Sequence, residues 1–220
     1  MMENYSALNN NDSILSQEAF LFDLDGVIID SERVYTEIWK EIDNRFPTGV
    51  SDFEYKIKGT TLDNILATYF PDREMALKVT ELLYELEGAI KYEVIPGARK
   101  FLEHLKNTGK KIALVTSSND VKMSHLWFQH PELKQYFDFI VTADMISRSK
   151  PDPEGYLLAA SKVGCYPEKC VVIEDSLQGV KAGKAAHAKV IGVAGTLPAE
   201  VLEPYSDIVV SDLSIFAKES

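Results

Sequence analysis

The sequence predicts an α/β protein in which a mostly parallel sheet is covered by helices on both faces and carries one all-helical insertion. Two observations predict this fold. From Pro96 onward, short apolar runs alternate with helical patterns of about 10–15 residues, which is typical of parallel strands joined by right-handed crossovers. A further apolar run at residues 20–24 is separated from the others by a long segment without a convincing strand.

The composition is that of a globular protein. The chain has 220 residues, of which 45% are hydrophobic and 26% are charged. A chain of this length buries roughly 70% of the surface that its unfolded form exposes, so it needs neither disulfides nor a structural metal to fold. The net charge of -11 repels nucleic-acid phosphates and anionic lipids. We therefore expect no nucleic-acid partner and no membrane partner.

The cysteines and the chain's apolar runs indicate the compartment. Cys165 and Cys170 are the two cysteines, too few for a disulfide scaffold, which favours a reducing environment. Residues 1–18 have neither the basic start nor the apolar middle of a secretory signal. The uncharged stretch 190–199 is far shorter than the roughly 20 residues that span a bilayer. We expect a cytoplasmic protein that is a monomer or a weak dimer.

The first half of the chain divides into three parts. Residues 1–18 are polar, and we expect a flexible leader that contributes little to the core. Residues 20–24 predict a buried strand that ends in a turn at Gly26. Residues 31–92 predict a helical unit, because apolar residues recur there at steps of three and four. One such stripe consists of Met75, Val79, Leu82, Leu83, Leu86 and Ile90.

After Pro96-Gly97 the chain alternates between helix and strand. We expect helices over 98–108, from about Asn119, over about 153–164 and from Ser176 to about 187. The expected strands are 111–116, 138–143, 170–175, 189–193 and 207–210. Residues 19–30 and 93–220 thus form the α/β core, and residues 31–92 form an insertion, here called the cap. Between these two bodies we expect a cleft.

Polar residues stand at or near the ends of the first four predicted strands. In an open parallel sheet the carboxyl ends of the strands share one edge, and ligands bind there. We therefore expect these residues to converge and to form a phosphoryl-transfer site, although they are far apart in the chain. They are Asp23, Asp25 and Gly26, then Thr116, Ser117 and Ser118, then Lys150, Pro151 and Asp152, then Glu174 and Asp175.

The acidic residues among them predict a bound cation. Asp23, Asp25, Glu174 and Asp175 would place four carboxylates in one small space, and two such charges about 4 Å apart repel by roughly 4 kcal/mol at an effective dielectric of about 20. Hard oxygen donors without a paired histidine or cysteine suit Mg²⁺ better than zinc or copper. The sequence therefore predicts a magnesium site.

In this order, the four segments resemble the haloacid dehalogenase superfamily. The helical insertion after the first strand is similar to that of its phosphatase and β-phosphoglucomutase branch, and the resemblance covers about residues 19–216. It implies a three-layer Rossmann-like core with a helical cap. It also implies that Asp23 is the nucleophile that forms an aspartyl-phosphate, and that Asp25 serves first as general acid and then as general base.

The same resemblance implies the remaining core roles. Thr116 and Lys150 would hold the phosphoryl oxygens. Glu174 and Asp175 would bind Mg²⁺ together with Asp23 and the backbone carbonyl of Asp25.

Two physical expectations follow from these roles. Asp25 must be protonated part of the time to serve a leaving group, so we expect its pKa to lie well above that of Asp23. Gly26 is expected to allow a sharp turn that brings backbone N–H groups near the phosphate.

Each motif also has a plainer interpretation. The acidic turn after the first strand would cap a helix at Ser31, and the residues after Thr116 would cap the helix that begins near Asp120. Ser176 would cap the helix after Glu174. Lys150 would be a solvated loop lysine. The spacing of Gly179 and Gly183 favours close packing of a helix on the sheet, and Cys170 favours a buried small side chain rather than a reactive thiol.

Substrate contacts are expected from two segments. Beside Thr116, the residues Ser117, Ser118 and Asn119 would line the site. From the cap we expect Tyr35, together with Lys58 and Gly59 in a cap turn, while Trp39 shares the helix face of Tyr35. The alternative for Tyr35 and Trp39 is ordinary packing within the cap. A helical cap over a charged site excludes water and selects the leaving group, which implies small soluble substrates.

The sequence predicts a Mg²⁺-dependent phosphohydrolase that acts on a small phosphorylated metabolite, such as a sugar phosphate, through an aspartyl-phosphate. A phosphomutase similar to β-phosphoglucomutase is the lesser alternative. Those mutases, which this chain resembles in its core, have a histidine at the position of Tyr35 and an arginine at the position of Leu62. A phospho-accepting receiver domain is an alternative from another class. It fits less well, because a chain that resembles a receiver has its acidic pair first, followed by the phospho-accepting aspartate, the hydroxyl and the lysine. Here the aspartate comes first and the acidic pair last, and receivers also lack a long helical insertion.

Overall fold

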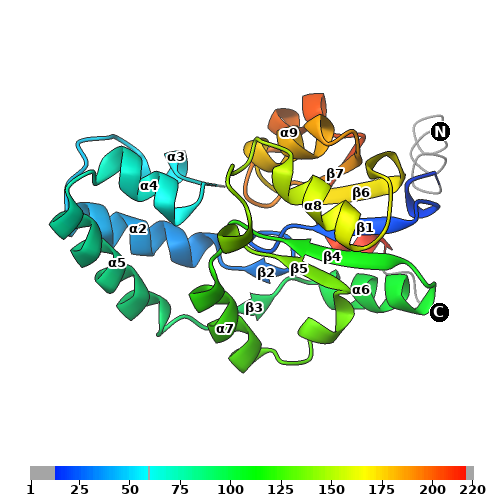
Figure 1. Ribbon diagram of the computed structural model, residues 1–220, viewed down its shortest axis with the longest axis horizontal. Helices are drawn as coiled ribbons and strands as arrows, with labels where there is room; N and C mark the ends of the chain where they lie inside the picture. The colour runs from blue at the N-terminus through cyan, green and yellow to red at the C-terminus, as the bar shows by residue number, and fades with distance from the viewer. Residues whose placement is uncertain (1–12, 59, 217–220) are drawn as a thin grey trace.

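The computed structural model describes residues 13–58 and 60–216, which form an α/β lobe and a smaller helical lobe (Figure 1). The α/β lobe contains a parallel six-stranded sheet in the order β5-β4-β1-β6-β7-β8. This confirms the predicted fold class and all six predicted strands. They are β1 (Ala19–Phe22), β4 (Lys111–Val115), β5 (Phe139–Val141), β6 (Cys170–Glu174), β7 (Lys189–Val193) and β8 (Ile208–Val210).

Helices cover both faces of the sheet, as the alternating pattern predicts. On one face lie α6 (Ala98–Asn107) and α7 (Asp120–Gln129), and on the other lie α8 (Glu154–Lys162) and α9 (Leu177–Ala185). Short elements complete the lobe. These are α10 (Ala199–Leu202), η1 (Lys134–Tyr136), η2 (Ala143–Met145), η3 (Pro167–Lys169), η4 (Glu203–Tyr205) and η5 (Leu213–Phe216).

The central strand β1 organises the core. Phe20 and Phe22 pack into the cluster that includes α6 and α7, whereas Ala19 and Leu21 pack into the cluster under α8 and α9. This alternation follows from the two-residue period of a strand. In the register, Phe22 lies beside Leu114 of β4 and Ile173 of β6. The residues that follow these three strands therefore emerge close together at one edge of the sheet.

The described residues of the cap form four helices, which pack around a cluster of aromatic side chains centred on Phe53. The helices are α2 (Glu32–Arg45), α3 (Phe53–Lys56), α4 (Leu62–Tyr69) and α5 (Arg73–Glu87). The ring of Phe53, which is fully buried, lies 5.0–6.0 Å from the rings of Trp39, Tyr69 and Phe70. Aromatic pairs at such distances add stability beyond the area that they bury.

Two details of the cap differ from the sequence prediction. The chain leaves and re-enters the α/β lobe through a short antiparallel pair, β2 (Ile29–Asp30) and β3 (Glu93–Val94), which the sequence did not indicate. In the predicted helical stripe, Val79, Leu82 and Leu83 are buried, but α5 ends at Glu87, so Ile90 is buried beyond the helix.

The segment before β1 is partly built into the core. Residues 1–12 of the expected leader lie outside the described residues, but Ile14 is only 2% exposed and belongs to the main apolar cluster. Lys189 Nζ also donates a hydrogen bond to Ser13 Oγ at 2.7 Å. The expectation that residues 1–18 contribute little to the core is therefore wrong for Ile14. Within the described residues, no helix combines the length and apolar character needed to traverse a bilayer.

The aromatic contacts of α6 generate a stability prediction. Phe101 is fully buried, and its ring lies 5.9, 5.8 and 5.0 Å from those of Phe20, Phe22 and Phe216. We expect Phe101→Ala to lower the free energy of unfolding by about 3–5 kcal/mol, because it leaves a cavity in the core. Phe128→Ala is the matched control, since Phe128 is 89% exposed, and it should change that energy by less than about 0.5 kcal/mol. Similar losses in both variants, measured by denaturant unfolding, would contradict this assignment of the core.

Candidate active site

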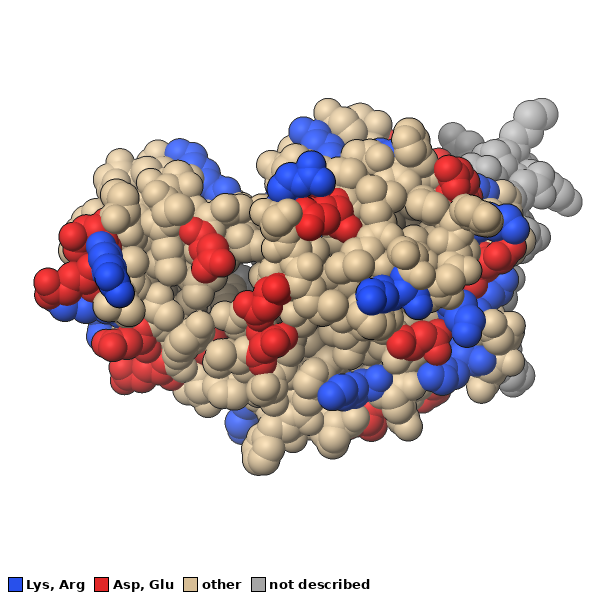
Figure 2. Space-filling view, viewed as in Figure 1, with Lys and Arg blue, Asp and Glu red and all other residues tan. Residues whose placement is uncertain are grey.

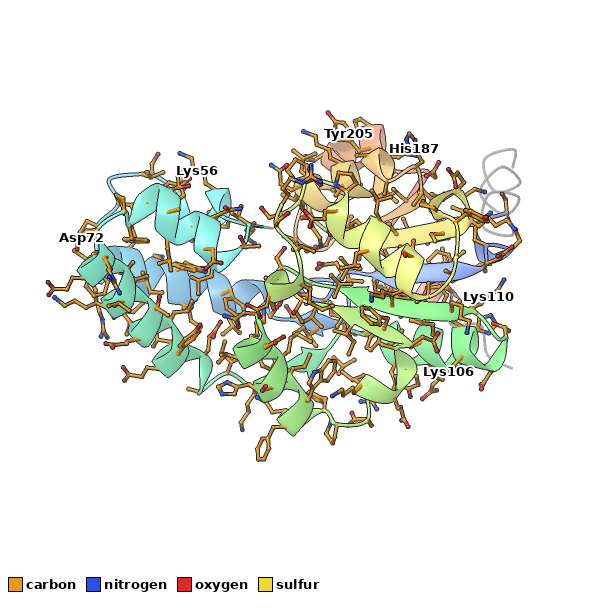
Figure 3. The ribbon with its side chains drawn as sticks, viewed as in Figure 1. Lys56, Asp72, Lys106, Lys110, His187 and Tyr205 are labelled. Carbon is orange, nitrogen blue, oxygen red and sulfur yellow. The ribbon has the colours of Figure 1, made fainter. Side chains whose placement is uncertain are left out.

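A cavity of about 140 Å³ lies between the cap and the carboxyl edge of the sheet. The space-filling view shows a hollow between the two lobes (Figure 2). The six residues labelled in Figure 3 lie on the outer surface of the two lobes, and none of them lines this cavity. The α/β lobe contributes Asp23, Asp25, Ser117, Ser118, Asn119, Lys122, Lys150, Asp175 and Ser176. The cap contributes Tyr35, Thr36, Trp39, Glu54, Ile57, Lys58, Thr60, Leu62, Ile65, Leu83 and Glu87.

Three buried carboxylates meet beside the cavity, and two of them, Asp23 and Asp175, line it. Asp23, Glu174 and Asp175 each offer an oxygen atom, and these atoms lie within 4.8 Å of one another. Lys150 Nζ donates hydrogen bonds to Asp23 Oδ1 at 2.5 Å and to Glu174 Oε1 at 2.6 Å. Three of the four predicted carboxylates and the predicted lysine are thus brought together. The side chain of Asp25 is not part of this group.

Further side chains hold the acidic group in place. Tyr156 Oη donates to Glu174 Oε1 at 2.8 Å, and Ser176 Oγ donates to Glu174 Oε2 at 3.0 Å. The hydroxyl of Thr196 donates to Asp175 Oδ2. The sequence analysis missed Tyr156 and Thr196, because a tyrosine on an amphipathic helix and a loop threonine carry no motif. Their function here is to orient carboxylates that approach from other elements.

Burial and crowding set the charge state of the group. Burial, assisted by the carboxylates of Glu174 and Asp25, raises the pKa of Asp23 to about 8 even though Lys150 acts in the opposite direction. Burial alone would lower the pKa of Lys150, but the carboxylates of Asp23 and Glu174 outweigh it and raise that pKa above its ordinary value. The lysine is therefore a cation at neutral pH, and it contacts two of the three carboxyl groups.

Two glycines allow this crowding. Gly26 has a φ of +74°, and a Cβ at this position would lie 1.9 Å from Asp175 Oδ2. A Cβ on Gly179, in the first turn of α9, would lie 1.8 Å from the carboxyl carbon of Glu174. The N–H of Gly26 donates to Ile29 O at 2.9 Å. The predicted sharp turn is present, but this N–H is used within the turn, and the need for glycine arises from the approach of Asp175.

Asp25 lies in a separate network on the side toward the cap. Lys122 Nζ donates to both carboxylate oxygens at 2.7 Å, Ser118 Oγ donates to Oδ2 at 3.1 Å, and the hydroxyl of Ser31 donates to Oδ1. Burial would raise the pKa of Asp25, but the Lys122 ammonium and these hydroxyls outweigh burial and hold the pKa below its ordinary value. The expected order of the two aspartate pKa values is therefore reversed in this structure.

The helix caps are only partly as the sequence predicts. Ser176 Oγ accepts the N–H of Gly179 at 3.0 Å, which confirms the predicted cap of α9. The cap of α7 is Asn119, whose side chain accepts the N–H of Lys122, and not one of the hydroxyls before it. Ser31 precedes α2 without capping it, because its hydroxyl is directed to Asp25.

Three of the four residues predicted in the loop after β4 line the cavity, and Thr116 does not. Thr116 is buried, and its Oγ1 accepts the N–H of Ser118 at 3.0 Å. Ser117, Ser118 and Asn119 line the cavity, and Asn119 Nδ2 also donates to Tyr84 Oη of the cap at 3.1 Å.

Of the cap residues predicted to contact substrate, those that the structure describes line the cavity, but their side chains also have partners within the cap. Tyr35 lines the cavity, but its hydroxyl donates to Glu87 Oε1 at 2.7 Å. Lys58 lines the cavity, with its Nζ 5.5 Å from the ring centre of Tyr55, whereas Gly59 lies outside the described residues. Trp39 lines the cavity and also packs on Phe53, as the interpretation of ordinary packing within the cap has it, while its contact with substrate stays a prediction.

Lys122 and Glu87 are the main polar residues of the cavity that the sequence analysis missed. Lys122 lies in the first turn of α7, three residues after Asn119. The sequence did offer a signal for Lys122, because α7 begins directly after the strand-end residues that follow β4. The start of such a helix lies at the same edge of the sheet as the ligand site. Glu87 ends α5 and gave no such signal.

Comparison with known proteins places the chain in a family. Residues 20–193 match the family of haloacid dehalogenase-like hydrolases. The phosphorylated carbohydrates phosphatase of Thermotoga maritima is 31% identical over 188 residues, which cover 82% of this chain and 87% of that protein. The bifunctional riboflavin kinase/FMN phosphatase of Arabidopsis thaliana is 34% identical over 88% of this chain, which spans about half (52%) of that longer protein.

A solved structure agrees with these relatives. The β-phosphoglucomutase of Clostridium difficile superposes with a TM-score of 0.75 and 25% identity, covering 90% of this chain and 92% of that one. The chain therefore belongs to the haloacid dehalogenase-like hydrolases. Within this family it falls in the branch of phosphatases and phosphomutases, and it is an enzyme of the phosphatase type. The resemblance inferred from its four strand-end motifs is confirmed.

The raised pKa of Asp23 predicts a pH dependence of stability without divalent cations. Its ordinary pKa is 3.8 and its folded value is about 8, so between these values the folded state binds more protons than the unfolded state, and stability falls as pH rises. Asp23→Asn should remove this part of the slope. Thermal unfolding between pH 4 and pH 8 in a chelator, for wild type and variant, measures it. Equal slopes in the two proteins would contradict the prediction.

The close approach of α9 to Glu174 predicts a second effect. Gly179→Ala should lower the free energy of unfolding by about 1–3 kcal/mol, because the added methyl group overlaps a buried carboxylate that cannot move freely. Gly88→Ala is the matched control, since a Cβ there would meet its nearest neighbour at 3.4 Å. Denaturant unfolding compares the two. A loss in Gly179→Ala no larger than in Gly88→Ala would show that Glu174 is not tightly held.

Proposed function

We propose that this phosphatase hydrolyses a small phosphorylated metabolite, such as a sugar phosphate, through an aspartyl-phosphate on Asp23. One observation carries the proposal. Asp23 follows the central strand and lies at a cavity between two lobes, in a buried group with Glu174, Asp175 and Lys150. A carboxylate so placed is a nucleophile supported by electrophilic groups, as two-step phosphoryl transfer requires.

The acidic group fits a Mg²⁺ ion. Asp23, Glu174 and Asp175 supply hard oxygen atoms that lie within 4.8 Å of one another, and Lys150 contacts Asp23 and Glu174. We propose that these residues hold Mg²⁺, together with the backbone carbonyl of Asp25. When bound, the ion would neutralise charge on the phosphoryl group and lower the pKa of Asp23 toward the ionised form that a nucleophile needs.

The proposed reaction has two steps. A carboxylate oxygen of Asp23 attacks phosphorus, the bond from phosphorus to the leaving-group oxygen breaks, and Asp25 donates a proton to that oxygen. A water molecule then attacks phosphorus, Asp25 takes its proton, and the bond to Asp23 breaks to release phosphate. Lys150 and Thr116 would hold the phosphoryl oxygens throughout.

The substrate class follows from the cavity and from the relatives. The cavity is small and is covered by the cap, which we propose selects the leaving group. Its cap side combines apolar side chains with Glu54 and Lys58. The named relatives include a phosphatase of phosphorylated carbohydrates and an FMN phosphatase, which supports a small phosphate ester as the substrate.

Two free cysteines, Cys165 and Cys170, support our proposal of a cytoplasmic location, because a reducing compartment keeps thiols free.

A phosphomutase is the second candidate, because the superposed β-phosphoglucomutase shares the fold. Tyr35 and Leu62 line the cavity. They occupy the two positions where the mutases have histidine and arginine, and this difference favours hydrolysis over mutase chemistry. Membership of the haloacid dehalogenase-like family argues against a receiver domain. Incubation with sugar phosphates and a bisphosphate activator separates the first two, since a mutase yields an isomeric sugar phosphate and a phosphatase yields inorganic phosphate.

The proposal predicts the effect of a single substitution. Asp23→Asn should lower kcat for phosphate release from a panel of phosphomonoesters, assayed with Mg²⁺, on the order of a thousandfold or more, because the amide cannot attack phosphorus. Asp72→Asn, at the outer part of the cap (Figure 3), is the matched control and should leave kcat unchanged. Turnover by Asp23→Asn equal to that of the wild type would refute the assignment of the nucleophile.

A further inference from the structure

Lys122 is a buried cation that the proposed mechanism does not use. Its side chain is only 7% exposed, and its Nζ lies 2.7 Å from both oxygens of Asp25. The other hydrogen bonds to this carboxylate come from Ser31 and Ser118. Lys122 is thus the group that contacts both oxygens of Asp25, and it lines the same cavity.

Lys122 also contacts the cap. Its Nζ lies 3.9 Å from the ring centre of Tyr35, which is within the range of a cation–π interaction. Tyr35 is held in turn by Glu87 and by Tyr92, whose hydroxyl lies 3.3 Å from that of Tyr35. The ammonium is therefore enclosed by a carboxylate of the α/β lobe and an aromatic ring of the cap.

Stability alone does not account for this arrangement. Removing a lysine and an aspartate from water costs several kcal/mol, and a buried ion pair is often no more stable than apolar residues of similar volume. Both members of the pair line the cavity, and Asp25 is two residues from the proposed nucleophile Asp23. At this position the orientation of the Asp25 carboxylate matters for proton transfer.

We propose that Lys122 is a positioning residue, which fixes the carboxylate of Asp25 in the orientation from which it serves the leaving group. The inference rests on the proposed function, because it assigns Lys122 a role that acts through Asp25. Ser31 binds Oδ1 and Ser118 binds Oδ2, each through a neutral hydroxyl on a separate segment. Lys122 joins both oxygens through one charged group, and this ammonium is itself held against the Tyr35 ring of the cap.

The dependence on leaving group distinguishes positioning from a general structural role. An alkoxide is a strong base and needs a proton as it departs, whereas p-nitrophenolate is a weak base and departs without one. The value of kcat/KM reports steps up to departure of the leaving group. A defect in the orientation of Asp25 should therefore reduce kcat/KM for alkyl phosphates and spare kcat/KM for p-nitrophenyl phosphate.

The experiment measures both substrates, with Mg²⁺, for wild type and Lys122→Met. We expect kcat/KM for the best alkyl phosphate to fall about tenfold to a hundredfold, while that for p-nitrophenyl phosphate changes less than about threefold. Adding Lys122→Met to Asp25→Asn should cause no further loss with the alkyl substrate, because residues that act as one unit are not additive. Lys122→Gln keeps an uncharged N–H donor on a shorter side chain, so it should retain more activity on the alkyl phosphate than Lys122→Met. It replaces Lys122→Met in the comparison if that variant does not fold.

Lys184→Met is the matched control. It breaks a Lys184–Asp207 pair, also of 2.7 Å, on the surface of the α/β lobe, and it should leave the ratio of the two kcat/KM values unchanged. Equal losses on both substrates, additive losses in the double variant, or a gain in alkyl activity would each overturn the inference. The proposed function is judged separately, by wild-type turnover and by Asp23→Asn, and it survives any of these outcomes.

Discussion

The mutual repulsion of three buried carboxylates is the constraint on which the rest of this structure depends. Asp23, Glu174 and Asp175 come from two neighbouring strands and share a space in which Lys150 compensates a single charge. Such a group is expensive to bury, and the surrounding chain offsets the cost with hydroxyl donors from Tyr156, Ser176 and Thr196. The parallel sheet makes the arrangement feasible, because its strand ends bring distant residues to one edge without a long loop.

The two aspartates of the first motif show how neighbouring positions acquire different chemistry. Asp23 and Asp25 are two residues apart, yet the pKa of the first is raised and that of the second is lowered. Burial acts to raise both pKa values. It prevails at Asp23, where Glu174 and Asp25 oppose the effect of Lys150, whereas Lys122 and two hydroxyls outweigh it at Asp25. This order of the two pKa values is the reverse of the one that a nucleophile at Asp23 and a proton donor at Asp25 require. The negative charge of a substrate phosphoryl group beside Asp25 would raise its pKa toward the protonated form that the proposed first step requires.

Much of the fold was predictable because it rests on local periodicity. Apolar runs placed all six strands of the sheet, and the breaks at Pro96-Gly97 and Gly109 placed α6. The pair of β2 and β3 was not predictable, since two residues carry no period. Ile14 was missed because a single apolar residue in a polar segment resembles a leader. The stripe on α5 was predicted, but its end was misplaced by three residues, because Ile90 is buried without being helical.

For the site, the sequence by itself determined which residue types stand at the strand ends: an acidic turn, a hydroxyl loop, a lysine and an acidic pair. Strand order then required them to converge, so Asp23, Lys150, Glu174 and Asp175 could be grouped in advance. Only the tertiary structure decided that Asp25 turns away toward Lys122, that Tyr156 supports Glu174, and that Gly26 and Gly179 make room for carboxylates. These depend on distances between side chains of different elements, and no local pattern of residue types encodes such distances.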